Sequence, residues 1–320
     1  MNCLRRIVST TALLSAFALA GCVSAPQIPS AGPVVSPRPV TKPIQPALPK
    51  AQSEESKALG LYYRRVQADL LVQGLLRTDG GGPDTPYTDT MLARDFEQIA
   101  FFDEYSGGGL NAGNGQPGRL KRWEGPVRFN TEFGSNISEL QQARYRANVQ
   151  SYAARLGRST GHPIGFSQSS ANFHVLFMGE DDRALVQNRV RALVPRIDPQ
   201  ALRIFANLPR SIHCLVVAFS NGPNSYGYTQ AVALIRSEHP DLMLRSCIHE
   251  ELAQGLGLAN DSPAARPSIF NDDEEFALLT THDEMLLRIL YDPRIRPGMN
   301  AEQAREQAEV IVAELLGSDS

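Results

Sequence analysis

The sequence predicts a mixed α/β domain of the α+β class, in which a twisted mixed sheet packs with helices and follows a helical N-terminal part. From residue 123 onward, segments with apolar residues at helical spacing are interleaved with short alternating segments typical of strands. No internal repeat occurs at the periods typical of solenoids. About 270 residues follow the first 52, enough for one large domain or one domain with an appended helical part.

Residues 53–122 are predicted to form a helical segment and a glycine-rich connector. An amphipathic helix is expected over 54–76, ended by the glycines at 80–82, and a second helical pattern lies near 91–102. The glycines from 107 to 118 have no strand before them and no Gly-Lys-Ser/Thr after them, so a connector is expected and not a phosphate-binding loop. The apolar positions of the first helix are Leu59, Tyr62, Tyr63, Val66 and Leu70.

The remaining part, residues 123–320, carries the sheet and the C-terminal helices. Ser138 and Gln141 form a capping box that predicts the start of a helix, and Gly157 is expected to end it. The other predicted elements are strands over 127–133, 171–178, 213–219 and 229–236, a helix over 183–194, and a turn at 221–224.

The first 21 residues have the pattern of an export signal. Arg5 and Arg6 precede a 14-residue apolar run, which is too short to span a membrane but suits the core of a signal peptide. Leu19-Ala20-Gly21-Cys22 then matches the lipobox, and the segment resembles bacterial lipoprotein signals. This resemblance implies a mature chain that begins at Cys22, is anchored by acyl chains such as palmitate, and, with Val23 next, faces the periplasm from the outer membrane. An ordinary signal with a chance cysteine is the alternative.

Residues 22–52 are predicted to be a lipidated, proline-rich tether. Eight of the 22 prolines fall between residues 26 and 49, and proline favours an extended, semi-rigid chain. The net charge of −3 becomes −5 once the two arginines of the signal are removed. Basic residues are dispersed among acids, so the sequence predicts no nucleic-acid partner.

After export and lipidation, two cysteines remain, Cys214 and Cys247. Disulfides persist in an oxidising compartment, so these two are predicted to pair. The alternative is two separately buried thiols, because a sequence does not give the distance between them.

A helix near the chain's C-terminal third carries the candidate site. Residues 245–262 read RSCIHEELAQGLGLANDS, and helical spacing places Glu250 and Gln254 one turn apart on one side. Two polar side chains at this spacing are how a helix presents two ligands to one metal ion. The opposite face is predicted to be core and consists of Leu244, Ile248, Leu252 and Leu256.

The same segment resembles the metzincin peptidase motif H-E-x-x-H-x-x-G-x-x-H. In the register that starts at Glu250, Glu251 takes the place of the catalytic glutamate and Gly257 that of the turn glycine. Phe270, in Ser268-Ile269-Phe270-Asn271, stands where the methionine of the Met-turn would be. Over residues 123–292 the chain thus resembles an uncharacterised domain-of-unknown-function family of bacterial lipoproteins with a degenerate, metzincin-like (zincin-like) site. The three ligand positions of the motif hold Glu250, Gln254 and Asn260.

These ligand positions offer oxygen atoms only. Zinc sites in proteins usually include several nitrogen or sulfur ligands, so we expect no metal and no other cofactor, and Glu251 is catalytic only if the site is active. His249 lies about 100° from Glu250 around the helix and is expected to form a local hydrogen bond. His282 and Asp283 could form an acid–base pair, but they fit better as the polar first turn of a helix.

Two functions follow from this pattern. The first is a non-catalytic lipoprotein whose peptidase-like scaffold binds an extended peptide or a cell-envelope component. The second is a metal-dependent hydrolase with non-standard ligands, in which Glu250, His249 or His282 holds the metal and Glu251 is the general base. A purely structural envelope protein is a third possibility.

Overall fold

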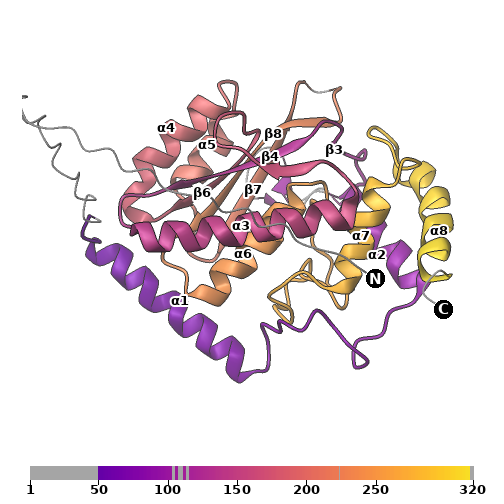
Figure 1. The fold of residues 1–320 in the computed structure, drawn as a ribbon, viewed down its shortest axis with the longest axis horizontal. Coiled ribbons are helices and arrows are strands. Elements are labelled where there is room, and N and C mark those ends of the chain that lie inside the picture. The colour runs from indigo at the N-terminus through magenta and orange to yellow at the C-terminus, as the bar shows by residue number, and fades with distance from the viewer. Residues whose placement is uncertain (1–49, 103–104, 107–110, 113–114, 223, 318–320) are drawn as a thin grey trace, which may run out of the picture. The chain divides into compact units, whose positions relative to one another are not determined.

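A six-stranded mixed sheet lies at the centre of the fold in a computed structural model that describes residues 50–102, 105–106, 111–112, 115–222 and 224–317 (Figure 1). All these residues belong to one compact unit. Neighbouring strands follow the order β5-β4-β6-β8, all parallel; β7 pairs antiparallel with β8, and β3 pairs parallel with the start of β8. The strands are β3 (Arg122–Trp123), β4 (Val127–Phe133), β5 (Ile164–Phe166), β6 (Phe173–Met178), β7 (Cys214–Ser220) and β8 (Gly227–Arg236).

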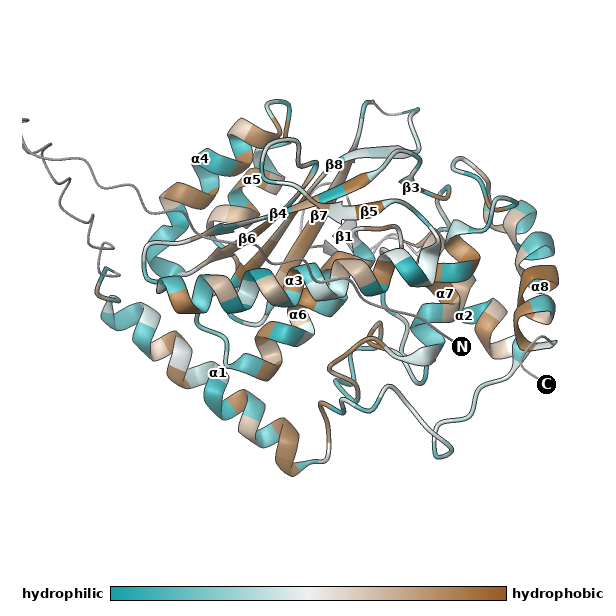
Figure 2. Ribbon diagram, in the orientation of Figure 1, coloured by the Kyte–Doolittle hydropathy of each residue, from teal (hydrophilic) through white to brown (hydrophobic). Residues whose placement is uncertain are grey.

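Helices cover both faces of this sheet. Val175 and Phe177 of β6 belong to the core under α3 (Glu139–Thr160) and α6 (Asp241–Gln254), whereas Leu176 and Met178 belong to a second core with α4 (Arg183–Leu193) and α5 (Pro199–Ala206). Because both faces are buried, β6 is apolar almost throughout, as Figure 2 shows for the central strands. The predicted mixed α/β class is confirmed.

Three further helices complete the larger core. α7 (Thr281–Tyr291) lies against α3, and α2 (Asp89–Phe101) packs against both α7 and α8 (Ala301–Gly317). Arg305 of α8 forms an ion pair with Glu97 of α2. Thus α2, which precedes residue 123, shares a core with the C-terminal helices. A two-stranded ribbon, β1 (Tyr105–Ser106) with β2 (Asn111–Ala112), follows α2 in the chain.

The first helix, α1 (Glu54–Val72), is attached to the body along one side only. Ser56 Oγ donates a hydrogen bond of 2.8 Å to Glu238 Oε1, and Tyr63, which is fully buried, donates through its hydroxyl to the carbonyl oxygen of Arg210. Next to its N-terminus lies a 3₁₀ turn, η1 (Glu180–Asp182), whose Asp181 accepts from the backbone N–H of Ser53. The other side of α1 faces solvent, and it includes the exposed apolar residues Leu61, Leu71 and Val72 together with hydrophilic ones, as the mixed colours of α1 in Figure 2 show.

The predicted start of α3 is confirmed, but its predicted end is wrong. Ser138 and Gln141 form the capping box, yet Gly157 lies inside the helix and Gly161 ends it with a φ of +65°. The helix continues because Ser159 and Thr160 are buried and Thr160 Oγ1 donates back to the carbonyl oxygen of Leu156. The short elements α5 and β5 are among those that were not predicted.

Several predicted features lie outside the described residues: the signal peptide, Cys22, most of the tether and the glycines at 107–109. In the described part of the chain, none of the helices has both the length and the apolar character needed to cross a bilayer.

Candidate functional site

The predicted site helix is α6, and it is buried on most sides. The predicted core face is confirmed, because Leu244, Ile248, Leu252 and Leu256 are all buried. Two aromatic side chains fix the end of the helix. Trp123 Nε1 donates to the carbonyl oxygen of Gly255 at 2.8 Å, and the hydroxyl of Tyr291 donates to that of Leu256 at 3.0 Å.

A disulfide ties α6 to the edge of the sheet. The predicted pairing of Cys214 with Cys247 is confirmed, with the two Cα atoms 5.8 Å apart and both residues buried. Cys214 is the first residue of β7 and Cys247 lies in the middle of α6. The bridge therefore fixes the distance between the site helix and the antiparallel edge strand.

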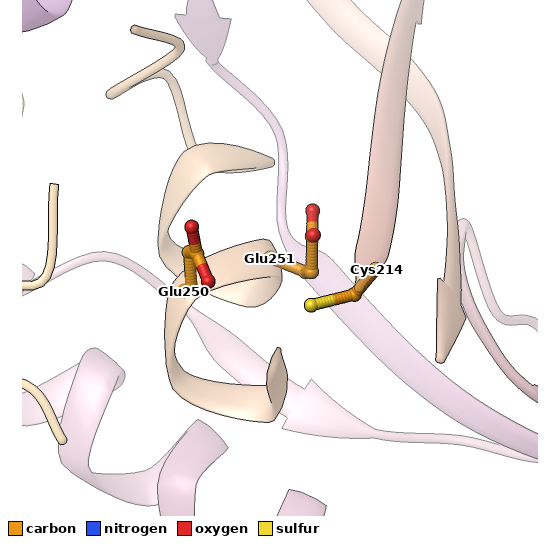
Figure 3. A group of neighbouring side chains, drawn as sticks. All are labelled: Cys214, Glu250 and Glu251. Atoms are coloured by element: carbon orange, nitrogen blue, oxygen red, sulfur yellow. The ribbon is translucent and has the colours of Figure 1, made fainter. Parts of the chain in front are cut away.

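Two carboxylates lie beside this bridge (Figure 3). Cys214 Sγ and one carboxylate oxygen each from Glu250 and Glu251 lie within 4.8 Å of one another. Glu251 is buried and Glu250 is partly exposed. Because Cys214 Sγ is in a disulfide, it is not the thiolate that binds metals, and the charged donors of this group are the two glutamates.

The other two aligned ligand positions have partners within the protein. Gln254 Nε2 donates to Asp261 Oδ1 at 3.3 Å. Asn260 Nδ2 donates to the carbonyl oxygens of Gln98 and Asp261, at 2.9 and 2.8 Å, so its amide connects the turn after α6 to α2. Sequence reasoning missed Asp261, which gave no signal except its position next to Asn260.

The turn after α6 requires glycine. Gly257 has a φ of +130°, and a Cβ atom there would lie 2.5 Å from the carbonyl oxygen of Lys121. Phe270 is fully buried in the loop that follows, where its carbonyl oxygen accepts from the backbone N–H of Ser262. Both positions thus have a structural reason to hold these residues.

His249 faces α3 and not the glutamates. Its ring stacks on Tyr152 with centroids 4.0 Å apart, and Tyr152 donates through its hydroxyl to the His249 carbonyl oxygen. The expected local hydrogen bond is wrong: His249 Nδ1 accepts from the backbone N–H of Leu279, 30 residues further along the chain. Burial, with the nearby charges of Arg155 and Arg245, lowers the pKa of His249 to about 3, so the ring is neutral at physiological pH.

His282 and Asp283 do lie in the first turn of α7, and Thr280 with Asp283 forms its capping box. Both residues are fully buried, unlike an ordinary polar first turn, because α2 covers them. His282 Nε2 lies 3.3 Å from Asp95 Oδ2 of α2, which the sequence analysis missed. Burial alone would lower the pKa of His282, but the carboxylates of Asp283 and Asp95 raise it above its ordinary value.

Asp283 also anchors the loop that contains Phe270. Its carboxylate accepts from the hydroxyl of Ser268 and from the backbone N–H groups of Ile269 and Thr280, at 3.1 and 2.9 Å for the two amides. These hydrogen bonds therefore connect the Phe270 loop to the first turn of α7. Neither His249 nor His282 belongs to the group of possible metal ligands formed by Glu250 and Glu251 among the described residues.

The comparison with protein families gives one match. A family model described as "Protein of unknown function (DUF2927)" matches residues 89–309, more than two-thirds of the chain. The chain belongs to this family. The DUF2927 match begins at the first residue of α2 and ends within α8, so it includes the two helices that share a core with α7. No curated protein and no solved structure matched the chain.

Proposed function

We propose that this DUF2927 protein is a lipoprotein of the outer membrane, anchored through Cys22, whose zincin-like domain binds an extended peptide or another envelope partner without catalysis. The order of elements supports the zincin-like part of this proposal. An antiparallel edge strand, β7, is bridged to the site helix α6, which is followed by the Gly257 turn, the Phe270 loop and the buried helix α7.

The set of possible metal ligands beside α6 is the main support for a non-catalytic function. Catalytic zinc normally has three protein ligands, mostly nitrogen or sulfur, and acidifies a bound water. The aligned positions supply a carboxylate and two amides, and the amide of Asn260 already connects the turn to α2. The sulfur of Cys214, which lies beside the two glutamates, is in the disulfide. Without an acidified water, Glu251 has no nucleophile to activate.

An extended peptide suits the exposed edge of the sheet. In the described chain, the backbone ladder of β7 joins it to β8 alone, and residues 216–220 are partly exposed. An edge strand of this kind can accept a peptide as an additional strand through main-chain hydrogen bonds. The disulfide at Cys214 holds this edge in place before any partner arrives.

Metal content tests the non-catalytic proposal. We expect the purified full chain to contain no stoichiometric zinc by elemental analysis, and a chelator to leave its melting temperature unchanged. The triple variant Glu250→His, Gln254→His, Asn260→His is expected to take up zinc. The double variant that keeps Asn260 retains the contacts to α2 and serves as the control for folding. One zinc per native chain would overturn the non-catalytic proposal, and a folded triple variant without zinc would contradict the metzincin register.

Peptide binding at the edge strand has its own test. A peptide selected from a random display library against the full chain should slow hydrogen exchange of amides in β7, residues 214–220, when it is added in excess. A scrambled peptide of the same composition is the control. Protection confined to another region would contradict the edge-strand part of the proposal.

A metal-dependent hydrolase is the second candidate, and the two adjacent carboxylates favour it. Glu250 and Glu251 supply oxygen atoms, which suit a hard cation such as Ca²⁺ or Mg²⁺ better than zinc. In this case the native chain would bind such a cation, and Glu251→Gln would abolish peptide hydrolysis while leaving the fold intact. A chain without bound cation or hydrolysis would exclude this candidate.

A further inference from the structure

A cavity of about 270 Å³ lies between α3 and α6, on the side of α6 opposite Glu250 and Gln254. Residues at helical spacing on both helices face it, and the stack of His249 on Tyr152 lies within its wall. It is separate from the Glu250–Glu251 group, because His249 faces α3 while the glutamates lie beside Cys214. The lining residues are Asn148, Ser151, Tyr152, Arg155, Arg158, Arg245, Ile248, His249 and Leu278.

The charge of this cavity is positive. Three guanidinium groups line it and no carboxylate does. Arg155 has partners outside the cavity, since its Nε pairs with Glu284 at 2.7 Å and its Nη2 donates to the carbonyl oxygen of Leu279. Within the described residues, no carboxylate lies within 4.0 Å of the Arg158 or Arg245 nitrogens, so these two charges are not neutralised by an ion pair.

The lining also contains polar groups that can donate hydrogen bonds. Ser151 carries a hydroxyl and Asn148 an amide, and both lie on the same stripe of α3 as the arginines. At the wall, burial and, to a smaller extent, the charges of Arg155 and Arg245 lower the pKa of His249, so its ring is neutral. Arg155 of α3 and Arg245 of α6 thus line the same cavity as His249.

We propose that this cavity binds the phosphate group of a phosphomonoester. Several separate donors around a positive space suit a tetrahedral dianion better than a planar carboxylate, and guanidinium groups bind phosphate through paired hydrogen bonds. The volume is near the lower limit of small-molecule pockets, so it admits a phosphate with a small attached group. Tyr152, Ile248 and Leu278 supply the apolar surface for that group. This site is independent of the peptide-binding proposal.

Calorimetric titration of the purified full chain tests this site. The probe is glycerol 3-phosphate, and we expect a Kd of about 1 mM or tighter. Arg158→Gln and Arg245→Gln should each weaken binding about tenfold, since each removes a charged donor without breaking a protein ion pair. Arg191→Gln, which removes an exposed arginine from α4, is the matched control and should leave Kd unchanged.

Two further arms identify the ligand and its position. Dihexanoyl phosphatidic acid, a soluble lipid, carries the same phosphomonoester, and tighter binding than glycerol 3-phosphate would assign the site to a lipid headgroup, whereas equal or weaker binding would assign it to a soluble ester. Nuclear magnetic resonance should show a higher pKa of His249 when the phosphate is bound. The proposal is overturned if neither phosphate compound binds or if acetate binds equally well. It is also overturned if the arginine variants bind with the wild-type Kd and the pKa of His249 does not change on binding.

Discussion

Removal of the disulfide between Cys214 and Cys247 should destabilise the domain by several kcal/mol. The bridge spans a sequence separation of 33 residues. For a loop of this length, the loss of loop-closure entropy from the unfolded chain corresponds to about 3.7 kcal/mol at 25 °C. The unfolding entropy of a domain of about 270 residues is about 0.57 kcal/mol per kelvin, so the melting temperature should fall by about 6 to 7 °C.

Thermal melts followed by circular dichroism measure this effect. The double variant Cys214→Ala, Cys247→Ala and the wild-type chain in reductant should both melt below the oxidised wild type. Reductant should not shift the melting temperature of the double variant. This control detects any effect of the reductant that does not involve the disulfide. A reduced wild-type chain that melts within about 1 °C of the oxidised chain would refute the reasoning, because a loss of about 3.7 kcal/mol should shift the melting temperature by several degrees.

Three further outcomes are expected. Metabolic labelling with a fatty acid should mark the wild-type chain but not Cys22→Ala, and equal label in both would contradict lipidation at this residue. Gly257→Ala should lower the free energy of unfolding by about 2 to 4 kcal/mol in urea, because its φ of +130° and the carbonyl oxygen of Lys121 both oppose a Cβ atom. Because the pKa of His282 is raised in the folded protein, its protonated ring stabilises the fold at pH values below the unfolded pKa of about 6.5. This stabilisation is lost as pH rises through the folded pKa, so the wild type should become less stable at higher pH. Asp95→Asn should flatten this dependence in melts at a series of pH values, and an unchanged slope would mean that Asp95 does not hold the proton on His282.

Features that depend on neighbouring residues were predicted well from the sequence. The capping box of Ser138 and Gln141 starts α3, and the four leucine and isoleucine positions expected from helical spacing in and just after α6 are all buried. These signals work because one turn of helix or one strand repeat sets their geometry. The pairing of Cys214 with Cys247 was predicted by a different argument, namely that export and lipidation leave these two cysteines.

The end of α3 shows where local signals stop being sufficient. Gly157 and Gly161 are four residues apart, and either could end a helix. The helix continues past Gly157 because Ser159 and Thr160 are buried by the rest of the fold. Packing, not the preference of a single glycine, decided between them.

The sequence by itself determined the class of the fold, the candidate site helix and the ligand types that its motif positions offer, and it predicts an export signal. Only the tertiary structure decided which side chains meet. Asp95 contacts His282, 187 residues away in the sequence, and Asn260 donates a hydrogen bond to Gln98, 162 residues away. Arg158 and Arg245 line one cavity from two different helices. Such contacts follow from how helices pack on a sheet over long sequence separations, and a spacing rule that extends over one helical turn carries no information about them.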